Sequence, residues 1–155
     1  MRFLLLDDEK SALLSMKFRL SRFRIEAATF EDDSVAFAAF SEAPSTFDAV
    51  IAKLAMRRTR GDSFAKRIWA IAPEMPITVL TGLSEQERFE DARVESGVCA
   101  LTNPASIADV LASLESQGLR LPYSASVAGS VAGSGTGAVA GTTAEGTSPS
   151  RFRSQ

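Results

Sequence analysis

The stretch Phe3-Leu4-Leu5-Leu6-Asp7-Asp8 decides the fold of this chain. Four apolar residues in succession, ended by two acids, are typical of a strand that is covered on both faces, as in a parallel sheet. A helical pattern follows at once, because Leu13, Met16 and Leu20 recur on one face of a helix from about residue 10 to residue 21. The beginning of the chain therefore predicts a strand followed by a helix.

The same strand and helix unit recurs along the chain up to about residue 117. The apolar runs predict further strands at residues 24–28, 47–52, 77–80 and 98–101. Helical spacing or capping residues predict helices between them and after the last, at residues 32–40, 64–72, 84–96 and 107–114. Five alternating units require crossover connections, so the sequence predicts an α/β fold with a doubly wound, five-stranded parallel sheet and helices on both faces.

Composition excludes several classes of function. The chain has 155 residues, of which 17 are Lys or Arg and 19 are Asp or Glu, giving a formal charge of −2. No global positive field therefore attracts nucleic acid or an anionic membrane. The chain has no histidine and a single cysteine, Cys99, which excludes an internal disulfide, a thiolate zinc cluster and histidine catalysis.

The composition changes near residue 117, where we place a domain boundary. Gly, Ser, Ala and Thr dominate residues 118–155, and large apolar side chains are scarce there. Such a segment cannot bury enough surface to offset the entropy of ordering it. We therefore expect a folded domain at 1–117 and a flexible, disordered low-complexity tail at 118–155. No stretch is long and apolar enough for a signal peptide or a membrane span, so we expect a cytoplasmic protein.

The candidate site lies at the carboxyl ends of the predicted strands, where doubly wound sheets place their functional residues. The residues that follow the apolar runs are Asp7, Asp8, Lys53, Thr81 and Asn103.

With this layout, residues 2–116 resemble the receiver domain of bacterial response regulators. In that family an acidic pair after the first strand binds Mg²⁺, an aspartate ends the third strand and accepts phosphate, and a Thr or Ser and a Lys bind the phosphoryl oxygens. Asp7-Asp8, Thr81, Pro104 and Gly61 match the family pattern. The resemblance implies a flavodoxin-like sheet of order 2-1-3-4-5 and a role in two-component or phosphorelay signal transduction.

Three functional positions depart from the family pattern. Lys53 stands where the family has its phospho-acceptor aspartate, Asn103 replaces the phosphate-binding lysine, and Ala100 replaces the common Tyr or Phe. Asp48 cannot substitute for the acceptor, because five strand residues place it about 16 Å from the functional edge. We therefore expect a degenerate receiver, or pseudo-receiver, that is not an enzyme and has no catalytic residue.

We expect the Lys53 ammonium to lie against Asp7 and Asp8 as a fixed charge in the place of a metal ion. The alternative is that Lys53 extends into solvent while the two acids stay hydrated. The ion pair predicts that Mg²⁺ binding is weak or absent and that no cofactor is bound. Asp7 and Asp8 would be metal ligands only if Mg²⁺ binding were retained.

Two surfaces are candidates for partner binding. Arg57, Arg58 and Arg60 form a positive patch beside the site, although a solvated loop is the more common interpretation. The second surface comprises Phe89, on the acidic helix predicted at 84–96, and Ala100. From the resemblance we expect a histidine kinase, a phosphotransfer protein or another regulator as partner, with a homodimer as an alternative and with neither nucleic acid nor membrane bound directly.

The sequence thus supports a receiver module that works by protein–protein contact without phosphorylation. Two alternatives stay open. One is a phospho-responsive receiver that uses an unusual acceptor. The other is a flavodoxin-like module that binds an anionic small molecule at Lys53, Thr81 and Asn103. The loop that carries Arg57, Arg58 and Arg60, the arginine loop, would then act as a lid.

Overall fold

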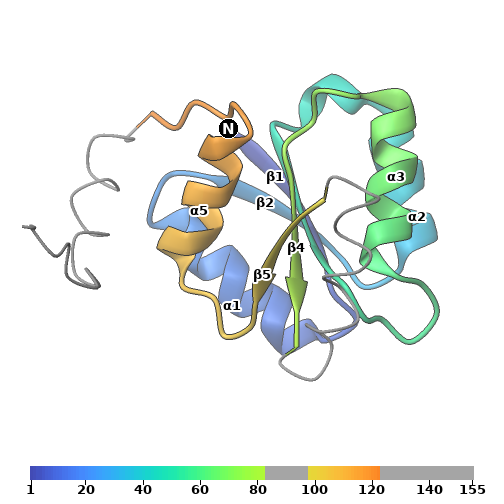
Figure 1. Ribbon diagram of the computed structural model, residues 1–155, viewed down its shortest axis with the longest axis horizontal. Coiled ribbons are helices and arrows are strands. Elements are labelled where there is room, and N and C mark those ends of the chain that lie inside the picture. Colours follow the sequence, from blue (N-terminus) through green and yellow to red (C-terminus); the bar gives the residue numbers. More distant parts are fainter. Residues whose placement is uncertain (83–97, 123–155) are drawn as a thin grey trace, which may run out of the picture.

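The structure is a computed structural model that describes residues 1–82 and 98–122 (Figure 1). Strands and helices alternate from β1 to β4, a helix follows β5, and all strand pairs in the sheet are parallel. The strands form one five-stranded sheet of order β2-β1-β3-β4-β5, so the predicted fold class is confirmed. The elements are β1 (Arg2–Leu6), α1 (Lys10–Ser21), β2 (Glu26–Phe30), α2 (Asp33–Glu42), η1 (Pro44–Thr46), β3 (Ala49–Lys53), α3 (Gly61–Ile71), β4 (Ile77–Thr81), β5 (Cys99–Thr102) and α5 (Ile107–Ser116).

The sheet separates two layers of helices, with α1 and α5 on one face and α2 and α3 on the other (Figure 1). Alternate residues of each strand point to opposite faces. In β1, Leu4 and Leu6 therefore belong to the apolar core beneath α2 and α3, whereas Phe3 and Leu5 belong to the core beneath α1 and α5. All four of these side chains are at most 1% exposed, which explains the continuous apolar run of the first strand.

The predicted elements within the described residues are all present, with strand boundaries shifted by one or two residues. The helix predicted from residue 10 to residue 21 is α1. β2 begins at Glu26 and not at residue 24, because Arg24 adopts a positive φ of 56° in the preceding turn. β3 begins at Ala49 and not at residue 47, because Phe47 still caps the preceding 3-10 turn, η1. The carboxylate of Asp48 accepts a hydrogen bond from the backbone N–H of Arg2, at 2.6 Å. The helix predicted at 84–96 lies outside the described residues.

The packed core extends a few residues beyond the predicted boundary at 117. Helix α5 ends at Ser116, and Gly118 adopts a φ of +100°, which turns the chain back toward the sheet. Leu121 is 7% exposed and packs with Leu119 on the core beneath α1 and α5. The rest of the predicted tail, from residue 123, lies outside the described residues. Within the described ranges no helix is both long enough and apolar enough to span a membrane.

Candidate functional site

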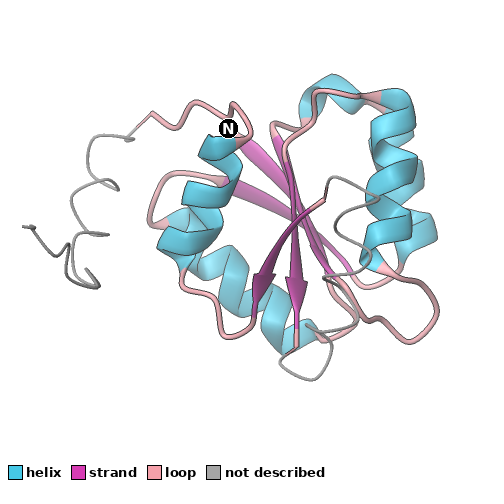
Figure 2. Cartoon of the chain, in the orientation of Figure 1, coloured by secondary structure: helices cyan, strands magenta, loops and turns pink. Residues whose placement is uncertain are grey.

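The candidate site forms where β1 and β3 end side by side. These two strands are neighbours in the sheet, with Leu6 paired to Ala52. Asp7 and Asp8 follow β1, and Lys53 is the last residue of β3. The strands lie side by side in one sheet (Figure 2), so their parallel pairing brings these three residues to one edge of it. The sheet topology therefore places two aspartates and one lysine within contact distance of one another.

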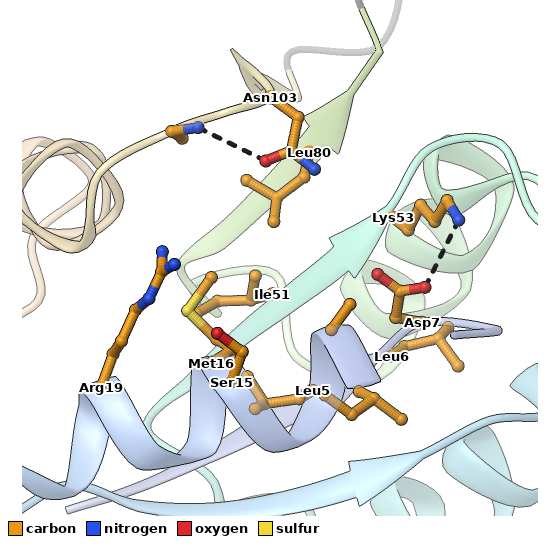
Figure 3. A pocket seen from close by; sticks show the side chains of 13 residues that line it. Leu5, Leu6, Asp7, Ser15, Met16, Arg19, Ile51, Lys53, Leu80 and Asn103 are labelled. Carbon is orange, nitrogen blue, oxygen red and sulfur yellow. Dashed lines mark hydrogen bonds and ion pairs between the residues drawn. The ribbon is translucent and has the colours of Figure 1, made fainter. Parts of the chain in front are cut away.

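The side chain of Lys53 contacts both acids. Its Nζ lies 2.8 Å from Oδ1 of Asp8. The same Nζ lies 3.4 Å from Oδ1 of Asp7, a contact drawn in Figure 3. The three side chains are partly withdrawn from solvent, with exposed fractions of 32% for Lys53, 14% for Asp7 and 18% for Asp8. The structure thus contains the contact that the sequence predicts, and the ammonium does not extend into open solvent.

Backbone N–H groups also bind the two carboxylates. Oδ1 of Asp7 also accepts a hydrogen bond from the backbone N–H of Glu9, at 2.8 Å. Oδ2 of Asp8 accepts one from the backbone N–H of Arg57, at 3.2 Å, and lies 3.8 Å from the Arg57 Nε. Asp8 therefore connects β1 to the loop after β3 as well as to Lys53.

The two acids respond to this environment in opposite ways. The hydrogen bond from Lys53 lowers the pKa of Asp8 below its ordinary value. Burial raises the pKa of Asp7, and the neighbouring ammonium only partly offsets this effect. The hydrogen bond to Asp8 raises the pKa of Lys53, so the amine stays protonated throughout the physiological range.

Thr81 and Asn103 lie at the ends of the next two strands but take no part in the ion pair. The hydroxyl of Thr81 is buried and donates a hydrogen bond to the carbonyl of Gly82, at 3.2 Å. The backbone N–H of Asn103 donates to the carbonyl of Thr81, and the side-chain oxygen of Asn103 accepts from the N–H of Ala105. The bond between Asn103 and Pro104 is cis.

The acidic pair lies against a fixed positive charge. Mg²⁺ requires oxygen ligands and carboxylate charge, whereas both carboxylates here already contact an ammonium group that would repel a divalent cation. Within the described part of the chain, no group of three or more His, Cys, Asp or Glu side chains forms a metal site.

The candidate partner residues are distributed over two regions. Arg57, Arg58 and Arg60 are exposed on the loop between β3 and α3, and Arg60 pairs with Asp62 at 3.1 Å. Ala100 is half-buried in β5 and packs on the core beneath α2 and α3. Phe89 lies outside the described residues.

Sequence reasoning missed the contact of Arg57 with Asp8. It recognised the arginine loop as a positive patch beside the site, but it treated the arginines as a surface for partners. The isolated bridge between Ala55 and Arg60, which folds the loop back, has no clear sequence signal.

Comparison with known proteins gives matches only at the level of structure. No family model and no curated protein matches the sequence. A response regulator receiver domain from Clostridium thermocellum matches with a TM-score of 0.68 and 25% identity, over 75% of this chain and 92% of that chain. An adenylate cyclase from Rhodopirellula baltica matches with a TM-score of 0.66 and 26% identity, over 75% of this chain and 85% of that one.

A chemotaxis protein from Vibrio cholerae shares the same fold, with a TM-score of 0.64 and 22% identity, over 74% of this chain and 96% of that chain. The chain therefore has the fold of response regulator receiver domains, and it spans most of the length of the solved receiver structures that it matches.

Proposed function

We propose that this chain is a receiver-type module of two-component signal transduction that acts through protein–protein contacts and not through phosphorylation. The similarity of fold to solved receiver domains supports the signalling class. The observation that carries the independence from phosphorylation is the Lys53 ammonium, 2.8 Å from Asp8. It stands at the strand end where the receiver pattern has its acceptor aspartate.

Replacing the acceptor by lysine removes the nucleophile of the phosphotransfer reaction. A phosphoryl group is accepted by a carboxylate oxygen with a free electron pair, and a protonated ammonium has none. The raised pKa of Lys53 keeps this group protonated. Asn103, a neutral amide, also replaces the lysine that binds the phosphoryl oxygens in the family pattern. We therefore propose a module without catalytic activity.

The other nearby carboxylates are poorly placed to replace the acceptor. Asp7 and Asp8 are engaged by Lys53 and by backbone N–H groups. Asp62 lies in the first turn of α3 and forms an ion pair with Arg60. Phosphorylation at any of these positions would first have to break an existing contact, which favours the phosphorylation-independent module over a receiver with an unusual acceptor.

We propose that Mg²⁺ binds weakly or not at all. One ammonium neutralises part of the charge of the acidic pair, and the third carboxylate of the family pattern is missing. A cation at this position would gain little attraction and would have to displace Lys53. No other cofactor is required for a module that works by contact alone.

The arginine loop is our proposed contact surface for a signalling partner. The side chain of Arg57 is 88% exposed, and Arg58 and Arg60 are also exposed beside the site. This surface suits an acidic region of a histidine kinase, a phosphotransfer protein or another regulator, because opposite charges accelerate and orient association. The contact does not require phosphate on this chain.

The test is an amide NMR titration of the full chain with Mg²⁺ and beryllofluoride, together with intact mass after acetyl phosphate treatment. We expect no shift at Asp7, Asp8 or Lys53 and no mass increase. Lys53→Asp restores a third carboxylate and should bind Mg²⁺. Lys53→Asn is the matched control, because it removes the ammonium without adding a carboxylate. A phosphoryl mass increase on the unmodified chain would overturn the proposal.

A further inference from the structure

A cavity adjoins the ion pair, and the proposed function does not explain it. It has a volume of about 170 Å³ and opens between α1, the ends of β1, β3 and β4, and the loop from β5 to α5 (Figure 3). An engineered apolar cavity of about 150 Å³ is large enough to hold benzene. The space therefore fits one small ring or a short alkyl chain.

The floor of this cavity is apolar. Leu5, Ile51 and Leu80 from three adjacent strands line it, and Met16 closes it from α1. Leu80 keeps 7% of its surface exposed and Ile51 keeps 3%, although both belong to the core beneath α1 and α5. An apolar group placed here would cover the surface that these side chains leave open to water.

The rim on the α1 side carries a guanidinium and a hydroxyl group. Ser15 and Arg19 are one helical turn apart, and both line the cavity (Figure 3). Within residues 1–82 and 98–122, neither side chain forms a hydrogen bond or an ion pair. Helix α1 contains no acidic residue that could pair with Arg19.

The opposite end of the cavity carries paired charges. Asp7 and Lys53 line it together, with Nζ of Lys53 3.4 Å from Oδ1 of Asp7, and Asp8 contacts both Lys53 and Arg57. These charges largely compensate one another, whereas Arg19 has no ion-pair partner among the described residues, so an anion is attracted to the Arg19 end. A ligand with one negative charge and an uncharged body fits this polarity better than a dianion.

We propose that this cavity binds a small monocarboxylate, with its carboxylate on Arg19 and Ser15 and its ring or short alkyl body over Met16, Ile51 and Leu80. The planar guanidinium can donate two parallel hydrogen bonds to a carboxylate, and the Ser15 hydroxyl can donate a third. The apolar body then follows the floor toward Asn103. This binding goes beyond the proposed signalling function. Its carboxylate contacts use neither the arginine loop nor Lys53, although Asp7 and Lys53 line the far end of the same cavity.

Phenylacetate and hexanoate are suitable probes, added to the full chain and followed by amide NMR. We expect saturable shifts that centre on Arg19, Ile51, Leu80 and Ala105. Benzyl alcohol and hexanol, which lack the carboxylate, should bind at least tenfold more weakly. Equal binding of the alcohols, or no saturable shift with either acid, would overturn the proposal. Shifts centred on Lys53 and the arginine loop would also overturn it.

Variants of α1 test the role of the guanidinium. Arg19→Met should weaken phenylacetate binding roughly tenfold to a hundredfold, as expected for loss of hydrogen bonds to a charged group. Arg22→Met is the matched control, because Arg22 is exposed, follows the same helix and does not line the cavity. It should bind phenylacetate as the unmodified chain does. Equal weakening in both variants would contradict a specific contact with Arg19.

A third variant tests whether the probes occupy the cavity, without changing the charge of its rim. Ala12→Met places a larger side chain in the cavity while leaving Arg19 in place. It should abolish binding of the acids and of the alcohols alike. Undiminished binding in Ala12→Met would show that the probes occupy another place, and the proposal would then be wrong.

Discussion

At the scale of single residues, one lysine changes the electrostatics of the whole carboxyl edge of the sheet. With an aspartate at position 53, three carboxylates would meet there and would require a metal ion to offset their repulsion. With Lys53, the protein supplies the cation itself, at 2.8 Å from Asp8 and 3.4 Å from Asp7. The positive charge that offsets the two carboxylates is therefore part of the chain.

Removing this cation should destabilise the fold. Lys53→Met leaves Asp7 and Asp8 facing each other, partly buried, with no opposite charge from β3. We expect a loss of about 1–3 kcal/mol in the free energy of unfolding at neutral pH, measured by urea denaturation. Lys66→Met, at an exposed position of α3, is the control and should change stability little. An unchanged Lys53→Met variant would mean that the ion pair adds no net stability.

The stability added by Asp8 should depend on pH with a defined sign. The pKa of Asp8 is lower in the folded chain than its ordinary value of 3.8, so folding favours the ionised form. This contribution is present above about pH 4 and is lost as the pH falls through the lowered folded pKa. Asp8→Asn should therefore cost about 1–2 kcal/mol at pH 6 and progressively less below pH 4, by urea denaturation at each pH.

Two comparisons make the pH prediction specific. Asp7→Asn should cost less than Asp8→Asn at pH 6, because burial raises the pKa of Asp7 and ionising it is unfavourable in the folded chain. Glu42→Gln replaces an exposed acid and serves as the control. A cost of Asp8→Asn that stays constant from pH 6 to pH 3 would contradict the argument.

The sequence predicts the ion pair because adjacent parallel strands must end at the same edge. Asp8 and Lys53 each follow an apolar run, so their approach depends only on the pairing of β1 with β3. The backbone N–H of Arg57 also binds Asp8, and this contact could not be predicted. It depends on the path of a loop with no periodic pattern, and loop conformation is set by local contacts.

At the scale of elements, the end of β3 is tied to the start of α3 by one close approach. The backbone N–H of Gly61 donates a hydrogen bond to the carbonyl of Leu54, at 2.7 Å. A Cβ atom at Gly61 would clash with the backbone oxygen of Lys53. The glycine is therefore required by space, and it lets α3 begin directly beside the strand end that carries the ion pair.

Gly61→Ala should force these two elements apart. Because the clash is with backbone and not with a flexible side chain, we expect a loss of about 1–3 kcal/mol in the free energy of unfolding, measured by thermal or urea denaturation. Ser63→Ala, two residues later on the exposed side of α3, is the control. If Gly61→Ala were as stable as the unmodified chain, the close approach of α3 to β3 would be wrong.

Polar contacts between α5 and β4 are an element-scale feature that periodicity did not predict. The hydroxyls of Thr78 and Ser113 lie 2.8 Å apart in the buried interface. The side-chain oxygen of Gln117 accepts a hydrogen bond from the backbone N–H of Ile77, at 2.8 Å. Apolar spacing predicts the core face of α5 correctly. It contains no information on which polar side chains form hydrogen bonds with the buried polar groups of β4.

At the scale of the whole molecule, the alternation of strands and helices is the strongest signal in the sequence. Five apolar runs separated by helical patterns leave few topologies open, since crossovers must be right-handed. The observed sheet order, β2-β1-β3-β4-β5, agrees with the resemblance to receiver domains. The packing of Leu119 and Leu121 beyond residue 117 is harder to predict, because composition is averaged over many residues and two leucines barely change the average.

The packing of these two leucines gives a prediction for truncated chains. Leu119 and Leu121 pack on the core beneath α1 and α5, and Leu121 is 7% exposed. A chain ending at residue 122 keeps both contacts and should unfold at the same temperature as the full chain. A chain ending at residue 117, the boundary expected from composition, should lose about 2–4 kcal/mol because burial of one leucine side chain contributes about 1.5–3 kcal/mol.

Calorimetric or fluorescence-detected thermal unfolding of the three chains separates the possible causes. Leu121→Ala in the full chain removes one apolar side chain without changing the length, so it should reproduce about half or more of the loss. If the chain ending at 117 were as stable as the one ending at 122, the packing of Leu119 and Leu121 would add nothing. If the chain ending at 122 were itself less stable than the full chain, residues 123–155 would contribute to folding, against the expectation from their composition.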